Sequence, residues 1–119
     1  LLSKELNLYP DTFSNSSGDI TSTVLHGNVK QKTVLIFDDT IQSGGTVKEA
    51  AEVLKESGAK EVHFMATHGP MVSKAYSVID ESLIDSVVVT NSIDHSQTHE
   101  KIHVVDSSSL FTTALEQWF

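Results

Sequence analysis

The stretch Thr33–Thr46, TVLIFDDTIQSGGT, limits what this chain can fold into more than any other part of it. An unbroken apolar run ends in two carboxylates, Asp38 and Asp39, and a loop of small residues follows before a helical pattern begins. Continuous apolar runs are typical of parallel strands that are buried on both faces. Open α/β sheets bind ligands beyond the carboxyl ends of such strands. The stretch therefore predicts a strand, a ligand-binding turn and a helix.

The composition of the turn favours an anionic ligand. Gly44 and Gly45 permit positive φ and a close approach of the backbone, while Ser43 and Thr46 add hydroxyl groups. The free N–H groups and the dipole at the start of the following helix attract negative charge. We predict a phosphate site beside two acids that take sugar hydroxyls or a metal ion. The candidate site residues are Asp38, Asp39, Thr40, Gln42, Ser43, Gly44, Gly45 and Thr46.

A purely structural interpretation of the same residues is that glycine and serine shape the turn and that the acids cap the helix. Asp38 and Asp39 lie several residues before the helical pattern, which is too early for a cap. The ligand-site interpretation is therefore favoured.

The rest of the chain alternates between strand and helix patterns. Helix periodicity runs from Thr46 to Gly58, where apolar side chains form one stripe and glycine ends the helix. This alternation predicts a single α/β domain over residues 1–119, with a mainly parallel sheet and helices on both faces in three layers. The further predicted elements are strands at 61–67, 84–90 and 101–105, a helix at 72–82, and a closing helix capped by Asp106–Ser109 with Leu110, Phe111, Ala114, Leu115 and Trp118 on its packing face.

The first part of the chain carries weaker signals. Residues 2–8 have a weak helical pattern that stops before Pro10, and residues 12–23 read as an exposed polar loop. A short strand is predicted within residues 23–28, with His26 as a bystander.

Several polar residues outside the loop have two interpretations. Thr67 and His68 end a predicted strand and can line the site, or Gly69 and Pro70 after them are simply turn residues. The polar residues at 90–92 can close one wall of the site or only begin a loop.

Three histidines, His95, His99 and His103, recur at every fourth position, which on one helix would align them for a metal. The strand pattern at 101–105 removes His103 from any such helix, so a solvated loop is the favoured interpretation.

The central stretch resembles the phosphoribosyl-binding signature shared by type I phosphoribosyltransferases and ribose-phosphate pyrophosphokinases, or PRPP synthases. The downstream segments resemble the C-terminal half of the PRPP synthases in order and spacing, and the resemblance covers about residues 26–117. Those segments are Gly58–Val62, Ala66–Pro70, Val87–Ile93 and Lys101–Asp106.

The resemblance implies a type I phosphoribosyltransferase-like fold and a magnesium-dependent reaction. Ribose 5-phosphate and ATP would give PRPP and AMP when the anomeric hydroxyl attacks the β-phosphorus. In this family the loop around Ser43–Thr46 would hold the 5-phosphate, and Asp38 and Asp39 would take ribose hydroxyls and help to place Mg²⁺. ATP lies mainly on the N-terminal half and across subunit contacts, so the resemblance also implies a homo-oligomer. Gln42 stands where relatives often carry Asp.

Charge and arginine usage qualify this expectation. The net charge is −8 and all eight basic residues are Lys, which argues against nucleic acid as a partner. Arg is the usual clamp for phosphoryl oxygens. Residues 13–19 correspond to the family's basic catalytic loop but contain no Lys or Arg. Together with a start at Leu1, this leads us to expect a fragment that is inactive alone, with a non-catalytic regulatory subunit or a type I phosphoribosyltransferase as alternatives.

The remaining composition excludes other classes of protein. No apolar run approaches the length needed to span a membrane, and no stretch reads as a signal peptide. The chain has no Cys, which excludes a disulfide framework and thiolate metal sites and agrees with an expected cytoplasmic location.

Overall fold

A computed structural model describes residues 13–14, 24–25, 27–72, 74–95 and 97–119. The predicted helix at 2–8, the turn at Pro10, His26 and most of the predicted 12–23 loop lie outside the described residues. The elements are β1 (Phe13–Ser14), β2 (Val24–Leu25), β3 (Thr33–Thr40), α1 (Gly45–Glu56), β4 (Glu61–His68), α2 (Ala75–Glu81), β5 (Ser86–Thr90), β6 (Ile102–Val105) and α3 (Ser108–Trp118).

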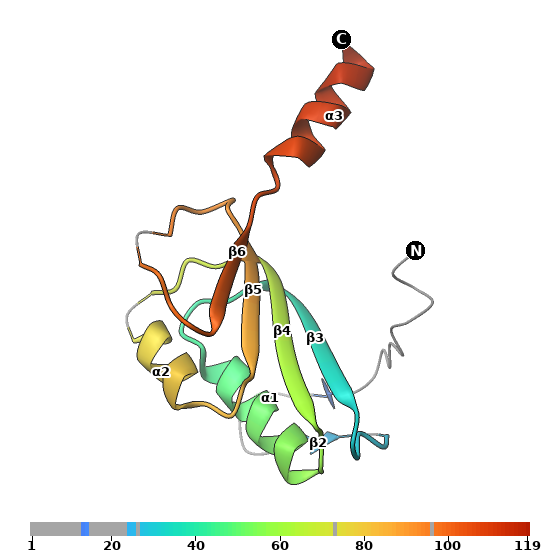
Figure 1. Ribbon diagram of the computed structural model, residues 1–119, viewed down its shortest axis with the longest axis vertical. Helices are drawn as coiled ribbons and strands as arrows, with labels where there is room; N and C mark the ends of the chain where they lie inside the picture. Colours follow the sequence, from blue (N-terminus) through green and yellow to red (C-terminus); the bar gives the residue numbers. More distant parts are fainter. Residues whose placement is uncertain (1–12, 15–23, 26, 73, 96) are drawn as a thin grey trace.

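The main sheet has four parallel strands in the order β3-β4-β5-β6, and β1 pairs with β2 in a separate antiparallel pair (Figure 1). This confirms the predicted α/β class. Strand β3 continues through Thr40, beyond the predicted end at Phe37, because its pairing with β4 extends to the register Thr40↔His68. All four carboxyl ends therefore meet at one edge of the sheet.

The core lies between one face of this sheet and the helices α1 and α2. Most of the periodic apolar residues of α1 are buried as the sequence predicts, although Val53 is only half-buried, and Gly58, with φ 89°, ends that helix. The N–H groups of Gly58 and Ala59 bond back to the carbonyls of Lys55 and Leu54, which is the Schellman pattern of a glycine stop. The largest fully buried side chains are Phe64, Leu54, Ile79, Val47, Val62, Val87 and Val89.

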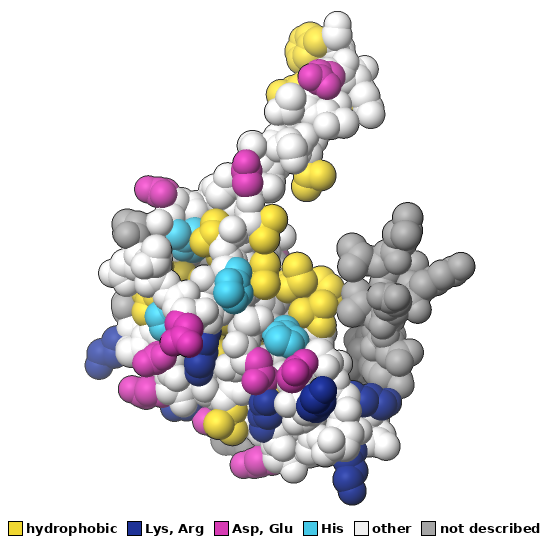
Figure 2. Space-filling view, in the orientation of Figure 1, with side chains coloured by type: hydrophobic (Ala, Val, Ile, Leu, Met, Phe, Trp, Pro, Cys, Tyr) yellow, Lys and Arg dark blue, Asp and Glu magenta, His cyan; other side chains and the backbone are white. Residues whose placement is uncertain are grey.

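The opposite face of the sheet is not covered by a described helix, so the prediction of helices on both faces is wrong for this part of the chain. The strands are added in one direction, and right-handed crossovers then place α1 and α2 on the same side. Phe37 is 54% exposed and Val105 is 50% exposed. Hydrophobic side chains are visible at the surface over the sheet in Figure 2.

The predicted closing helix forms as α3 but has no buried residue and extends away from the sheet (Figure 1). Its apolar side chains therefore do not pack on the sheet, and Trp118 is 85% exposed. None of the described helices is long and apolar enough to cross a membrane.

Candidate functional site

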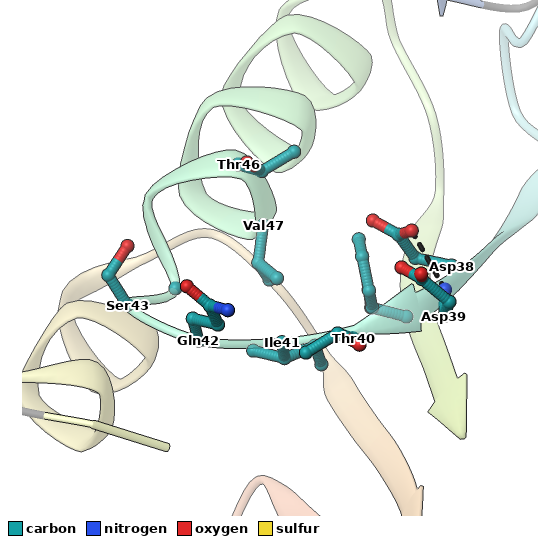
Figure 3. Close-up of a pocket in the computed structure, with 10 residues that line it drawn as sticks. Asp38, Asp39, Thr40, Ile41, Gln42, Ser43, Thr46 and Val47 are labelled. Atoms are coloured by element: carbon teal, nitrogen blue, oxygen red, sulfur yellow. Dashed lines mark hydrogen bonds between the residues drawn. The ribbon is translucent and has the colours of Figure 1, made fainter. Parts of the chain in front are cut away.

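A cavity of about 380 Å³ lies where the carboxyl end of β3 meets the start of α1 (Figure 3). It contains every predicted site residue except Gly45, which begins α1 beside it. Three apolar residues that sequence reasoning did not assign also line it. The lining residues are Asp38, Asp39, Thr40, Ile41, Gln42, Ser43, Gly44, Thr46, Val47 and Phe64.

The two carboxylates lie side by side at one end of this cavity (Figure 3). One Asp38 oxygen accepts a hydrogen bond from the backbone N–H of Asp39 at 2.8 Å, which turns the Asp38 carboxylate back over the strand end. Both side chains belong to exposed residues. Two adjacent, exposed carboxylates are suited to binding cations and to accepting hydrogen bonds from hydroxyl groups.

The start of α1 lies at the other end of the cavity. Gly44 is its N-cap with φ 79°, and no side chain caps the helix. The Lys48 N–H makes the first helical bond, to the Gly44 carbonyl at 3.0 Å. The N–H groups before Lys48 have no partner inside the helix, and the first turn carries no acidic residue. This end of the cavity is therefore suited to an anion.

Gly44 also satisfies a packing requirement. A Cβ atom at this position would lie 3.3 Å from the Ala75 carbonyl oxygen and 3.3 Å from Ile79 Cγ1. The loop therefore rests directly on α2, and only glycine meets both this close approach and the positive φ.

The floor of the cavity is apolar. Ile41, Val47 and Phe64 are 2%, 1% and 1% exposed. Periodicity places Val47 on the buried stripe of α1 and Phe64 on the buried side of β4, but only the sheet register shows that they lie under the loop.

His68 lies at the same sheet edge without lining the cavity. Its Nδ1 lies 2.8 Å from the Ser92 hydroxyl, and that hydroxyl donates to the Thr67 carbonyl at 3.1 Å. The Thr90 hydroxyl donates to the same carbonyl at 2.7 Å. Since the Ser92 hydroxyl has one proton, these contacts favour His68 with the proton on Nδ1. The polar residues after β5 thus orient His68 and the end of β4 rather than close the cavity.

Asn91 has a different function, because it joins the end of β5 to the start of α3. Its amide donates to Asp106 at 2.8 Å, and its side-chain oxygen accepts from the Ser107 N–H at 2.9 Å. The backbone N–H and hydroxyl of Ser108, with the Asn91 amide, hold the pKa of Asp106 below its usual value. The N-cap of α3 is Ser107, whose side chain makes no capping bond, so the predicted cap is replaced by a bond from the Ser108 N–H to Asp106 at 2.9 Å.

The three regularly spaced histidines do not converge. His103 lies on β6, His99 accepts the Lys101 N–H at 3.2 Å, and His95 contacts the turn at Gly69. Among the described residues, no group of three or more His, Cys, Asp or Glu side chains could hold a metal ion. The described residues 94–95 and 97–100 form no helix, as the loop interpretation predicts.

Fold and cavity together define an α/β domain with a helix-terminus anion cradle beside paired carboxylates at the end of a parallel strand. Comparisons with known proteins identify the family of this domain. The model of the phosphoribosyl synthetase-associated domain matches residues 6–119, and the chain therefore belongs to that family.

Similar proteins carry a consistent name. Ribose-phosphate pyrophosphokinase 2 of Schizosaccharomyces pombe is 35% identical over 104 residues, covering 85% of this chain and 32% of the relative. The ribose-phosphate pyrophosphokinase of Thermotoga maritima is 37% identical over 89 residues, 75% of this chain and 28% of the relative. The crystal structure of phosphoribosylpyrophosphate synthetase from Mycobacterium smegmatis superposes with a TM-score of 0.75 at 33% identity, covering 82% of this chain and 34% of that one. The chain thus spans about a third of the length of these relatives.

Proposed function

We propose that this chain is the ribose-5-phosphate-binding, C-terminal half of a ribose-phosphate pyrophosphokinase with a type I phosphoribosyltransferase-like fold. The reaction is the conversion of ATP and ribose 5-phosphate into PRPP and AMP for nucleotide biosynthesis. The observation that carries the proposal is the cavity, which combines a helix terminus without acidic residues and a pair of carboxylates.

Ribose 5-phosphate has the polarity that such a cavity requires. The phosphate binds to the first-turn N–H groups of α1 and to the hydroxyls of Ser43 and Thr46. The ribose hydroxyls donate to Asp38 and Asp39 at the other end of the cavity. No Lys lines the cavity among the described residues, so the charge of the phosphate is balanced by backbone dipoles and by a cation that binds with it.

The two carboxylates of the cavity suit a Mg²⁺ ion that is shared between the protein and the phosphate of the ligand. This ion usually binds to one or two carboxylates and completes its shell with water and phosphate oxygens. Asp38 and Asp39 supply the two exposed carboxylates, and no third acidic or histidine ligand joins them among the described residues. When bound, Mg²⁺ would neutralise charge on the phosphoryl groups. The proposal therefore requires that Mg²⁺ and the sugar phosphate increase each other's affinity.

The proposed function also involves ATP and partner subunits. ATP binds mainly to the N-terminal half of the longer protein, and the longer protein forms a homo-oligomer in the cytoplasm. The exposed apolar residues of α3 and of the open sheet face support further protein contacts. A non-catalytic regulatory subunit is the second candidate. It is favoured by the absence of Arg from the sequence, since Arg commonly stabilises phosphoryl transfer.

The decisive experiment is a titration of the ¹⁵N-labelled chain with ribose 5-phosphate, with and without Mg²⁺, followed by amide NMR. Shifts should concentrate at residues 43–46, and Mg²⁺ should tighten binding. Ribose and inorganic phosphate serve as partial ligands and should bind more weakly, because each occupies one end of the cavity.

Two matched variants test the roles of the residues. Asp39→Asn should weaken binding by about tenfold or more, the range for one charge-assisted hydrogen bond. Glu56→Gln removes one negative charge at the far end of α1 and should leave the affinity unchanged. Absence of binding at millimolar ribose 5-phosphate in a folded sample would refute the sugar-phosphate site.

A further inference from the structure

The turn that follows β4 is bonded to the backbone of residues 41–44, the loop between β3 and α1 that we call the phosphate loop. The Ile41 N–H, one residue after β3, donates to the carbonyl of His68, the last residue of β4, at 2.9 Å. Beyond it, the Val72 N–H donates to the Gln42 carbonyl at 3.0 Å. The Met71 N–H contributes a longer contact of 3.4 Å to the Ile41 carbonyl. The two shorter distances lie in the normal range for amide hydrogen bonds.

Met71 gives this turn its direction. Its φ is 47°, in the left-handed region that non-glycine residues rarely adopt. Its side chain is 6% exposed and belongs to the same buried cluster as Ile41. A residue keeps this unfavourable conformation only where the surrounding structure holds it there. Residues of this kind are often found at ligand clamps. Here the buried side chain and the bond from the next residue hold Met71 in place.

The phosphate loop is therefore held from one side at two points. Val72 bonds to the carbonyl of Gln42, and α2 packs against Gly44 within 3.3 Å of a Cβ position. Gln42, at the first of these points, and Ser43, between the two, both line the cavity (Figure 3). Val72 is 47% exposed, and its hydrogen bond to the loop comes from its backbone N–H.

We propose that Met71 and Val72 are positioning residues for sugar-phosphate binding, because their turn delivers the Val72 N–H that holds the phosphate loop in its binding shape. The inference rests on the proposed function for its ligand, ribose 5-phosphate. Neither residue touches that ligand. Both residues act on the loop through the hydrogen bond from the Val72 N–H to the Gln42 carbonyl. Because this bond exists without ligand, its effect on the order of the loop can be measured in the free protein.

The sharpest test removes only the hydrogen-bond donor. Incorporation of the α-hydroxy analogue of valine at position 72 replaces the amide with an ester and keeps the side chain. Val72→Ala is the matched control, since it keeps the N–H and changes a half-exposed side chain. The two readouts are ¹⁵N order parameters of residues 42–46 in the free protein and the affinity for ribose 5-phosphate.

In the ester variant, the order parameters of residues 42–46 should fall from about 0.85 towards 0.6, the range of flexible backbone. The dissociation constant for ribose 5-phosphate should rise about tenfold, as for loss of one ordering hydrogen bond. Val72→Ala, which keeps the N–H, should change both values much less than the ester does. A second pair of variants is Met71→Gly and Met71→Ala. The loop should be more ordered in Met71→Gly than in Met71→Ala, because glycine accepts the positive φ at this position.

The possible outcomes separate this inference from the proposed function. Unchanged order parameters in the folded ester variant would overturn the inference, whatever happens to the melting temperature. A lower melting temperature with unchanged order and affinity would indicate a merely structural contact and would also overturn it. If the unmodified chain does not bind ribose 5-phosphate, the proposed function fails, and the order parameters alone decide the inference.

Discussion

Replacement of Gly44 with alanine should destabilise the domain through two separable terms. The backbone term arises because Gly44 has φ 79°, where an L-residue costs about 1–2 kcal/mol. The packing term arises because the new Cβ would lie 3.3 Å from the Ala75 carbonyl oxygen, a backbone atom that cannot rotate away. Moving α2 to relieve such an overlap costs about 1–3 kcal/mol. We expect a total of about 2–5 kcal/mol, the sum of these ranges.

Two glycines in the same chain are controls for the separate terms. Gly45→Ala should be neutral or stabilising by up to about 1 kcal/mol, because its nearest neighbour is 3.7 Å away and alanine favours a helix. Gly27→Ala should show the backbone term alone, since Gly27 has φ 116° and nothing within 4 Å of a Cβ position.

The assay is urea unfolding at 25 °C followed by circular dichroism, with the free energy of unfolding extrapolated to water. The expected order of stability is Gly45→Ala, then Gly27→Ala, then Gly44→Ala. If Gly44→Ala were as stable as Gly45→Ala, the close packing of the phosphate loop on α2 would be refuted. In the folded Gly44→Ala protein, the affinity for ribose 5-phosphate should also fall, because the loop is displaced from α2.

Three further perturbations follow from other contacts. Gly69→Ala should destabilise by about 1–3 kcal/mol in urea unfolding, because the new Cβ would lie 2.9 Å from a Val89 methyl group; an unchanged midpoint would contradict this. Lys101→Met should cost about 1–2 kcal/mol, since the Lys101 ammonium donates to the Asp80 and Ser82 carbonyls at 2.9 and 3.0 Å, at the end of α2. The exposed control Lys74→Met should cost less than about 0.5 kcal/mol, and equal losses would refute the assignment. Burial raises the pKa of Asp85, but bonds from Lys55 and the Val62 N–H outweigh this and lower it from 3.8. A lowered pKa in the folded state stabilises the domain above pH 3.8, and this contribution is lost as the pH falls through the folded value. Lys55→Met should flatten this acid dependence between about pH 5 and pH 3, and an unaltered slope would argue against the ion pair.

The central unit of the fold could be predicted from sequence because its signals are local. The apolar run of β3, the two acids and the glycines of the loop follow one another within the stretch Thr33–Thr46, and the α1 stripe continues from it. Parallel strands must place their carboxyl ends together, so the position of the cavity follows from the same pattern. Both glycines of the loop permit positive φ, and Gly44 but not Gly45 adopts it.

The arrangement of the helices could not be predicted from these local signals. Periodicity shows which face of a helix is apolar, but it does not show which side of a sheet the helix covers. Strand order decides that, and here it places α1 and α2 together. The amphipathic pattern of α3 likewise predicted a helix but not its lack of contact with the sheet.

The sequence by itself determined the α/β class, the acid pair, the glycine-rich turn and the helix that begins after it. Each of these depends on propensities and periodicities that act over a few neighbouring residues. Only the tertiary structure decided that Phe64 lies beneath the loop, that Ser92 orients His68, and that Val72 bonds to Gln42. Those contacts join residues that are distant in sequence, and strand register and packing bring them together only in the folded chain.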